Sequence, residues 1–306
     1  MTIQPFWLGF WRLADPKISL ASFAGLFMAA CFAAADTGLH PGWLALTVLG
    51  VFCVEVAKNA SGEWVDFDSG TDLAIAAEDR SPFSGGKRVM VDALMTREQT
   101  RAVAIIFFLA AIVIGLLITF LREPRVLAVG LLGMLLAWSY HGAPLRLSYR
   151  GLGEVAVAIA YGPLVVCGTY LVQTGALNAP LLHAAMALGL LIAAFLWINE
   201  FPDYHADLGA SKNTLVVRLG RETAATGYVT LLGSGYLWLL ICALHYQSYG
   251  MLWGLLGAVP AAFSAWRLLN QYQNTAAIVP AQAACLLSFI LMAAGCGLGY
   301  WLAGPA

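Results

Sequence analysis

Three polar side chains, Asn199, Asp203 and Asp207, follow one another at intervals of four residues in the stretch NEFPDYHAD. On a helix this spacing places them on one face, about one turn apart. Carboxylate and amide oxygens suit Mg²⁺, which binds one or two carboxylates and completes its octahedral shell with waters and phosphates. The spacing therefore indicates a site for Mg²⁺ and a phosphorylated ligand.

A second polar face lies earlier in the chain. Its members fall at i, i+4, i+8 and i+11, and two aspartates follow at the helix end: Glu55, Asn59, Glu63, Asp66, Asp68 and Asp72. The two acidic clusters, 55–79 and 200–207, hold ten of the seventeen acidic residues. Their mutual repulsion is destabilising unless cations offset it. The expected ligand is a pyrophosphate that shares Mg²⁺ with these acids.

Basic residues accompany both faces. Lys212 lies five residues beyond the last aspartate of NEFPDYHAD, and Arg80, Lys87 and Arg88 bracket the glycine pair of SPFSGGKR. Metal ions together with Lys or Arg stabilise the charge of a departing phosphate group. The acids and bases together predict a diphosphate site, in which Asn59 is a further substrate contact.

Apolar helices must position these residues. The chain has 306 residues, 60% of them hydrophobic and 11% charged, with a mean hydropathy of +0.78, whereas soluble domains carry about 25% charged residues. Backbone groups in lipid must be satisfied internally, which favours helices, so we expect an all-α polytopic membrane protein. Nine runs are predicted to cross the membrane, the fourth being short: 18–36, 43–60, 101–121, 126–140, 152–173, 180–199, 225–245, 249–269 and 277–303.

The placement of Lys and Arg predicts the orientation. With a cytoplasmic N-terminus, fourteen of the sixteen basic residues fall on the cytoplasmic side, and only Arg122 and Arg125 fall on the other. The long cytoplasmic loops, 61–100 and 200–224, are expected to carry the site. No cleavable signal peptide is visible in the sequence. The prediction is a multi-pass protein of the inner (cytoplasmic) membrane.

The two acidic stretches resemble known motifs. NEFPDYHADLGASKNTLVVRLG is similar to the second aspartate-rich motif of the UbiA superfamily of intramembrane prenyltransferases. EVAKNASGEWVDFDSGTD resembles the first motif in the form usual for the MenA-like branch. WSYHGAPLRLSYRGLGEVAVAIAYGPLVVCGTYLVQTG resembles the segment that joins the fourth and fifth helices of that branch.

The resemblance implies nine helices around a central cavity open to lipid, capped by two cytosolic loops, in a single domain of residues 1–306. It also implies Mg²⁺ as cofactor, and Lys212 as a contact to the diphosphate. Together with the residues read from the spacing, the predicted metal ligands are Asn59, Glu63, Asp66, Asp72, Asn199, Asp203 and Asp207. One departure stands out: this chain has Gly62-Glu63 where the family commonly has Asn-Asp, and Asn59, one turn earlier, is placed to replace the amide.

The reaction that the resemblance implies is ionisation of an allylic polyprenyl diphosphate, whose cation is shielded from water in an apolar, aromatic cavity. The residues assigned catalytic roles are Asp66, Asp203, Asp207, Tyr140 and Glu154. Tyr149 and Arg150 are assigned to substrate binding. Both tyrosines can instead be anchors at the membrane interface, and Glu154 can instead be a rim residue paired with Arg150.

Three functions are weighed. The first is transfer of the polyprenyl group to a small aromatic acceptor, 1,4-dihydroxy-2-naphthoate in menaquinone-type quinone synthesis. The second, kept open by Gly62-Glu63, is cyclisation of the prenyl diphosphate without an acceptor. The third, a transporter, is disfavoured because the acids gather at one face and no inverted repeat is seen. Membrane lipid is an expected partner, and nucleic acid is not.

Overall fold

The computed structural model describes residues 5–304, and every regular element among them is a helix. The predicted all-α class is confirmed. The first half comprises α1 (Pro5–Ala14), α2 (Pro16–Asp36), α3 (Pro41–Asp68), α4 (Thr71–Ala74), η1 (Ala77–Asp79), α5 (Arg97–Leu121), α6 (Val126–His141) and η2 (Leu147–Arg150). The second half comprises α7 (Gly153–Ile159), η3 (Ala160–Leu164), α8 (Val165–Thr174), α9 (Ala179–Gly209), α10 (Leu215–Leu219), α11 (Arg221–His245), η4 (Tyr249–Gly257), α12 (Ala258–Gln271) and α13 (Thr275–Ala303).

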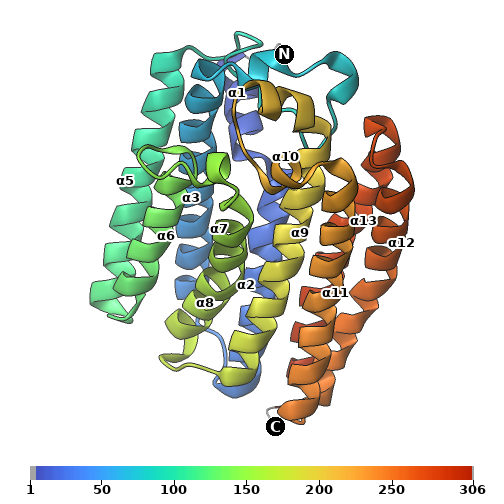
Figure 1. Ribbon diagram of the computed structural model, residues 1–306. Coiled ribbons are helices and arrows are strands. Elements are labelled where there is room, and N and C mark those ends of the chain that lie inside the picture. Colours follow the sequence, from blue (N-terminus) through green and yellow to red (C-terminus); the bar gives the residue numbers. More distant parts are fainter. Residues whose placement is uncertain (1–4, 305–306) are drawn as a thin grey trace.

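The long helices run side by side along one axis, and the two chain ends lie at opposite ends of the bundle (Figure 1). We call the end near the N-terminus the cavity end and the other the far end. Eight helical segments are long and apolar enough to cross a membrane. The predicted fourth crossing forms α6, which has only 16 residues. The count of nine crossings therefore stays a prediction.

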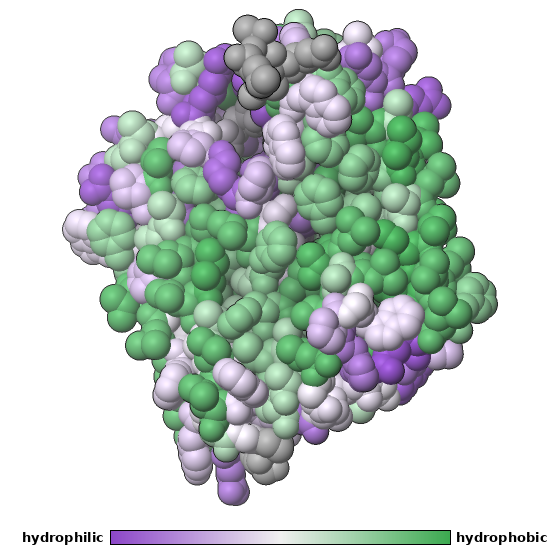
Figure 2. Space-filling model, turned by 180° about the vertical axis from the view of Figure 1, so that it is seen from behind, coloured by the Kyte–Doolittle hydropathy of each residue, from purple (hydrophilic) through white to green (hydrophobic). Residues whose placement is uncertain are grey.

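The surface follows the same division. Hydrophobic side chains cover the middle of the face shown in Figure 2, and hydrophilic side chains gather toward its two ends. Large apolar residues such as Ile106, Phe120 and Val259 are among the most exposed. A surface of this kind is suited to lipid, because water would penalise so much exposed apolar area.

The helices that carry the acids are longer than their apolar runs suggest. α3 continues to Asp68 and α9 to Gly209, so residues 61–68 and 200–209, which lie beyond the predicted crossings, are helical, as the spacing of their acids indicates. The chain leaves α3 only where Gly70 takes a positive φ of 80°, a conformation that favours glycine. The polar turns stay helical because their side chains face a cavity and not lipid.

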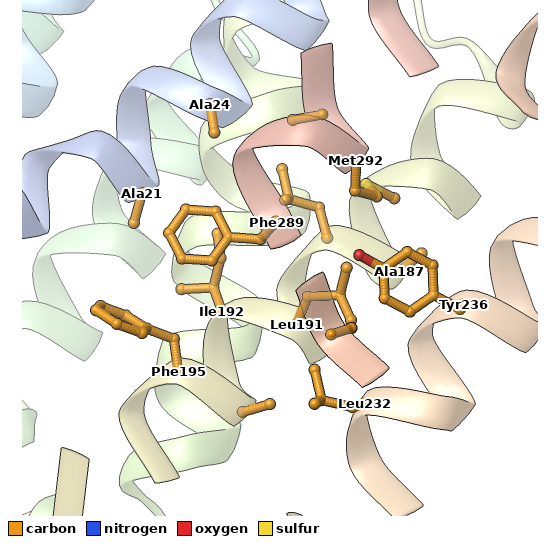
Figure 3. Packing of buried hydrophobic residues seen from close by; sticks show 14 of the residues in the cluster. Ala21, Ala24, Ala187, Leu191, Ile192, Phe195, Leu232, Tyr236, Phe289 and Met292 are labelled. Carbon is orange, nitrogen blue, oxygen red and sulfur yellow. The ribbon is translucent and has the colours of Figure 1, made fainter. Parts of the chain in front are cut away.

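The core of the bundle is built around α9. This helix packs against α2, α11 and α13, and its residues form the largest share of the main buried cluster. In Figure 3, Leu191 and Phe195 of α9 lie close to Phe289 of α13 and Leu232 of α11. Because α9 is held on several sides, the acidic face at its cavity end has a fixed position.

Two glycines allow a close approach between α9 and η3. A Cβ on Gly189 would lie 2.3 Å from the carbonyl oxygen of Ala158, and one on Gly162 would lie 2.5 Å from that of Ala185. The π-turn of η3 contains Pro163 and separates α7 from α8. A side chain at either glycine would prevent this contact, since small residues let helices approach closely.

A cap segment, residues 69–96, crosses the cavity end between α3 and α5. A small apolar cluster that includes Leu13, Val56, Val89 and Met95 joins this segment to α1 and α3. Ion pairs reinforce the joint: Arg12 Nη1 lies 2.6 Å from Asp92 Oδ2, and Lys87 pairs with Asp15. The cap is thereby packed onto the helices that carry the first acidic face.

Candidate active site

A polar cavity of about 610 Å³ lies beneath the cap segment. Residues of both acidic faces line it, one group from α3 and α4 and the other from α9, whereas Glu55 lines a second cavity and Asp68 pairs with Arg97. All seven predicted metal ligands line this cavity: Asn59, Glu63, Asp66, Asp72, Asn199, Asp203 and Asp207. The structure thus brings together two groups of residues that lie more than a hundred positions apart in the sequence.

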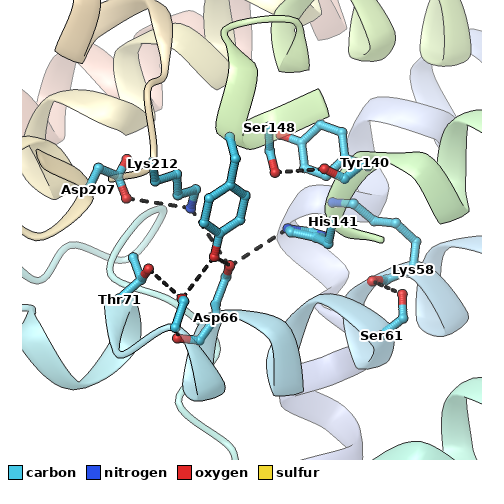
Figure 4. Close-up of polar contacts among 11 residues, drawn as sticks. Lys58, Ser61, Asp66, Thr71, Tyr140, His141, Ser148, Asp207 and Lys212 are labelled. Atoms are coloured by element: carbon cyan, nitrogen blue, oxygen red, sulfur yellow. Dashed lines mark hydrogen bonds and ion pairs between the residues drawn. The ribbon is translucent and has the colours of Figure 1, made fainter. Parts of the chain in front are cut away.

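Asp66 is the centre of the polar contacts drawn in Figure 4. The Tyr149 hydroxyl donates a hydrogen bond to Asp66 Oδ1 at 2.7 Å. His141 Nε2 and Lys212 Nζ each lie 3.7 Å from Asp66 Oδ2. Lys212 Nζ also lies 3.5 Å from Asp207 Oδ1, so this one ammonium group spans the two acidic faces.

The charges around Lys212 fix its protonation. Burial lowers the pKa of its ammonium group, but the carboxylates of Asp207 and Asp66 outweigh burial, and the pKa is raised well above its usual value. Asp72 shows the opposite balance. Burial, together with the charges of Asp66 and Glu63, raises the pKa of the Asp72 carboxyl group to about 7. The cavity therefore has more negative charge than its own cations offset.

Several carboxylates in the cavity have an oxygen without a hydrogen-bond donor, which suits binding of Mg²⁺. Asp203 Oδ1, Glu63 Oε2 and Glu200 Oε2 are buried and have no hydrogen-bond partner among the described residues. Within residues 5–304, however, no three His, Cys, Asp or Glu side chains are close enough to hold a metal by themselves. Mg²⁺ typically takes one or two carboxylates and obtains its remaining ligands from waters and a phosphorylated substrate. The residues present fit that mode of binding and not a closed metal site of protein ligands alone.

The Gly62-Glu63 departure has a structural explanation. A Cβ on Gly62 would lie 2.5 Å from His141 Cε1, so the imidazole occupies the space beside this glycine. Glu63 Oε1 accepts a hydrogen bond from the Met90 amide at 2.8 Å, which ties α3 to the cap segment. Asn59 Nδ2 donates to the carbonyl of Leu13 at 2.8 Å.

The second acidic face receives support from a residue that the sequence did not single out. Gln282 of α13 is fully buried, and its Nε2 donates to Asn199 Oδ1 at 3.0 Å. This bond leaves one lone pair of the Asn199 oxygen free. A wholly buried glutamine in an apolar helix was the available signal, since polar groups within membrane helices tend to be functional.

Four of the predicted basic contacts, Arg80, Lys87, Arg88 and Lys212, line the cavity, with different partners. Arg88 Nη1 donates to the carbonyl of Asp72 at 3.0 Å. Lys87 pairs with Asp15, as noted above, and Arg80 is exposed at the cavity mouth. Among these residues only Arg80 has its charged group free of a protein contact in the described chain.

The remaining predicted residues differ in their position relative to the cavity. Tyr140 lines the cavity, and Tyr149 reaches the site through Asp66. Arg150 is exposed and donates to the carbonyl of Pro144 at 3.0 Å, away from the cavity and from Glu154. Glu154 is buried behind the wall, where its Oε1 accepts from the Leu215 amide at 3.3 Å and its carboxyl group lies against Glu200. Glu154 therefore reaches the cavity only through Glu200.

A second cavity, of about 220 Å³ and mostly apolar, continues toward the middle of the bundle between α3, α5, α6 and α8. Four residues line both cavities, and we call them the neck: Lys58, Tyr140, Val157 and Tyr161. Sequence reasoning counted Lys58, at the end of the predicted crossing 43–60, only among the basic residues of the cytoplasmic side, and it left Tyr161 without a role. Lys58 could have been singled out because it is a cation next to an apolar run, and ionisable residues within membrane helices are energetically unfavourable and tend to be functional.

Comparison with known proteins agrees with this architecture. The sequence pattern of the UbiA prenyltransferase family matches residues 23–281. The chain is 29% identical over 215 residues to the 1,4-dihydroxy-2-naphthoate octaprenyltransferase of Haemophilus influenzae, covering 69% of this chain and 68% of that one. It is 26% identical over 302 residues to the enzyme of the same name from Escherichia coli, covering 94% of each chain.

A solved structure of a UbiA homolog from Archaeoglobus fulgidus bound to GPP and Mg²⁺ has the same fold. Its TM-score is 0.61 at 14% sequence identity, over 94% of this chain and 98% of that one. The matched family pattern covers most of the chain and includes the helices that carry both acidic faces. This protein is therefore a multi-pass integral membrane enzyme that belongs to the UbiA prenyltransferase family.

Proposed function

We propose that this enzyme transfers a polyprenyl group from an allylic diphosphate to 1,4-dihydroxy-2-naphthoate, in a reaction that requires Mg²⁺. The observation that carries the proposal is that the two cavities are adjacent and share the four lining residues of the neck. The acidic cavity under the cap suits a metal diphosphate, and the apolar cavity on the other side of the neck suits a hydrocarbon chain. An allylic diphosphate has those two chemical parts in that order.

The diphosphate is held at the polar end in this proposal. Lys212 and Arg80 contribute positive charge. Asp203, Asp207 and Asp66 line the same cavity and are the carboxylates that would bind Mg²⁺. Mg²⁺, when bound, supplies Lewis-acid stabilisation of the leaving diphosphate. Tyr149 orients Asp66 through the hydrogen bond to its Oδ1. The predicted ligands from the first acidic face, Asn59, Glu63 and Asp72, and Asn199 of the second are part of this proposal.

The hydrocarbon chain enters the apolar cavity. Its lining includes the apolar side chains of Val54, Ile114, Val129 and Met134. The cavity excludes water from the carbon that ionises, and a low-polarity environment strengthens the electrostatic contacts of the departing group. Tyr140 and Tyr161 at the neck present aromatic faces beside that carbon, where they stabilise positive charge.

The step balances as follows. The bond between the allylic carbon and the diphosphate oxygen breaks, and its electron pair leaves with the diphosphate. A ring carbon of the acceptor then donates a π pair to form the new carbon–carbon bond. That ring carbon then loses its proton to the released diphosphate, and aromaticity returns. No oxidant or reductant is needed.

The acceptor is proposed from the relatives. Two of them, described above, are named for 1,4-dihydroxy-2-naphthoate. The alternative is cyclisation of the prenyl diphosphate without an acceptor, and Gly62 with Glu63 is the feature that keeps it open. In this chain Glu63 holds the cap through Met90 and Gly62 accommodates His141. The departure thus has a role in packing, which favours the transferase.

Orientation and location belong to the same proposal. Lys212, Lys87, Arg80 and Arg88 all line the cavity at one end of the bundle. Because basic residues favour the cytoplasmic side, we place the cavity end in the cytoplasm and the protein in the inner membrane. Residues 1–306 then form one domain with nine crossings, α6 included.

Mass spectrometry of the products tests the proposal. The purified protein is incubated with Mg²⁺ and a long-chain prenyl diphosphate, with and without 1,4-dihydroxy-2-naphthoate. Prenylated naphthol that forms only with the acceptor is the expected result. A cyclic hydrocarbon or alcohol that forms without acceptor supports the alternative. The Asp203→Ala protein is the control, and its diphosphate release is expected to fall to background.

A further inference from the structure

We propose that Lys58 at the neck binds the carboxylate of the aromatic acceptor, and that ionisation of the prenyl diphosphate depends on this contact. The inference rests on the proposed function and names the group that selects the acceptor. It would make Lys58 a residue that both recognises the second substrate and suppresses reaction without it.

Position is the first argument. Lys58 lies on α3, one turn beyond Glu55, and is one of the four residues that line both cavities. With the diphosphate in the polar cavity and the chain in the apolar one, the carbon that ionises lies at the neck. The ammonium group of Lys58 is therefore beside the reacting carbon and not beside the phosphates alone.

The second argument is that Lys58 has no anionic partner. Its Nζ lies 4.5 Å from the centre of the Tyr140 ring, and Figure 4 shows the side chain reaching toward that ring. Within residues 5–304, no carboxylate oxygen lies within ion-pair distance of this ammonium group. The ionisable groups that act on it include two acids, Glu55 and Asp66, and two bases, Lys87 and Lys212.

The charge of Lys58 also affects ionisation of the substrate. An ammonium group over the face of Tyr140 occupies the place where an allylic cation would gain most from that ring. Two positive charges a few ångströms apart in a medium of low polarity also repel strongly. An unpaired Lys58 thus opposes formation of the cation. A carboxylate that pairs with Lys58 removes this opposition, so the acceptor itself permits ionisation.

The walls of the neck suit a planar aromatic acid. Tyr140 and Tyr161 flank Lys58 with aromatic rings, which can stack on the acceptor. Glu55 is 7% exposed and lies against Ser19, Ser22 and Tyr161, and its Oε1 has no hydrogen-bond partner. A hydroxyl group of the acceptor would donate a hydrogen bond to this oxygen. Lys58 and Glu55 would then bind opposite kinds of group on one ring.

The test compares Lys58→Met with Lys58→Arg and with wild type. Two acceptors are used, 1,4-dihydroxy-2-naphthoate and 1,4-dihydroxynaphthalene, which lacks the carboxylate. Wild type is expected to prefer the acid roughly tenfold or more in kcat/KM, the scale of one charge-assisted hydrogen bond. Lys58→Met is expected to lose most of that preference, whereas Lys58→Arg retains it. The KM for prenyl diphosphate stays within about twofold in both variants, because the phosphate contacts of Lys212 are untouched.

Diphosphate release without acceptor is the second readout. It is expected to be several times faster in Lys58→Met than in wild type, since the opposing charge is gone. A merely structural lysine would lower both rates together. Unchanged preference for the acid in Lys58→Met overturns the carboxylate contact, and slower acceptor-free release overturns the gating. Lys17→Met, which removes a lysine from the same polar cavity but outside the neck, is the matched control and keeps the preference.

These outcomes are separable from failure of the proposed function. If the wild type forms a cyclic product and prenylates neither acceptor, the transferase proposal fails before Lys58 is tested. If it prenylates both acceptors equally, the transferase stands and the role of Lys58 is overturned. Thermal unfolding of each variant in detergent, with and without Mg²⁺ and inorganic diphosphate, confirms that the cavity end is intact.

Discussion

At the far end of the bundle, Asp36 accepts hydrogen bonds from the Tyr170 hydroxyl at 2.6 Å, the Asn178 amide at 2.9 Å and the Tyr300 hydroxyl at 2.9 Å. At the cavity end, Asp203 and Glu63 each bury an oxygen that has no partner. Both regions place carboxylates at the end of an apolar bundle. The far end completes its carboxylate with the protein's own donors, whereas at the cavity end the described residues leave these two oxygens without a donor.

The difference separates a structural acid from a functional one. Asp36 joins four helices, because its partners lie on α8, at the start of α9 and on α13. A carboxylate that accepts hydrogen bonds from fixed donors on several helices stabilises the packing of those helices. A buried carboxylate oxygen without a hydrogen-bond donor lowers the stability of the fold. Such groups persist where a ligand supplies the missing contact.

The largest expected effect is loss of activity on neutralising an incomplete acid. Asp203→Asn should lower the rate of diphosphate release about 10²–10³-fold, the scale for removing one group that stabilises developing charge. Its melting temperature should equal or exceed that of wild type, because the oxygen it replaces has no partner. Initial rates and thermal unfolding in detergent measure the two quantities.

Asp36→Asn is the counterpart at the far end, and its rate should stay within about twofold of wild type because it touches neither cavity. A clear loss of stability in Asp203→Asn, or a hundredfold loss of activity in Asp36→Asn, would remove the distinction between the two regions.

Metal binding gives the next largest effect. Mg²⁺ with inorganic diphosphate should raise the melting temperature of wild type, since a ligand at about 100 times its Kd adds roughly 2.7 kcal/mol. Removal of Mg²⁺ by a chelator should abolish transfer. Asp36→Asn should show the same rise as wild type, whereas Asp203→Asn should show little or none. Equal rises in all three proteins would place the metal outside the polar cavity.

Two tyrosines offer the same chemical change in both regions. Tyr149 and Tyr170 each donate one short hydrogen bond to a carboxylate, at 2.7 Å to Asp66 and 2.6 Å to Asp36. Tyr149→Phe should lower kcat about tenfold, the scale of one hydrogen bond to a charged group, because Asp66 loses its orientation. The KM for the acceptor should change little. A rate unchanged within twofold would mean that Lys212 and His141 suffice to orient Asp66.

Much of this arrangement could be predicted from the sequence. Four-residue spacing placed Asn199, Asp203 and Asp207 on one face of α9, and the excess of basic residues on one side agrees with a cavity at a single end. The periodicity of a helix is local, so it is legible in one stretch of chain. That the two acidic faces meet in space came from the resemblance and the shared side of the membrane.

The parts that the sequence did not reveal depend on distant contacts. Hydropathy ended the second helix before residue 61, although the polar turns continue to Asp68 because a cavity replaces lipid there. Arg150 and Glu154 have helical spacing, but Gly151, with a φ of 65°, separates η2 from α7 and directs them apart. The neck required knowing that α3, α6 and α7 converge on Lys58, Tyr140 and Val157.

The smallest expected effect is that of Tyr170→Phe, the far-end match of Tyr149→Phe. It removes one of three donors to Asp36 and should lower the free energy of unfolding by about 0.5–1.5 kcal/mol, with no change in rate beyond about twofold. The loss is modest because Asn178 and Tyr300 still bind the carboxylate. Unfolding in a denaturing detergent, followed for both Phe variants, gives the comparison. A larger effect of Tyr170→Phe on rate than on stability would mean that the far end is coupled to the cavity through α9, and the two regions could then no longer be treated as independent.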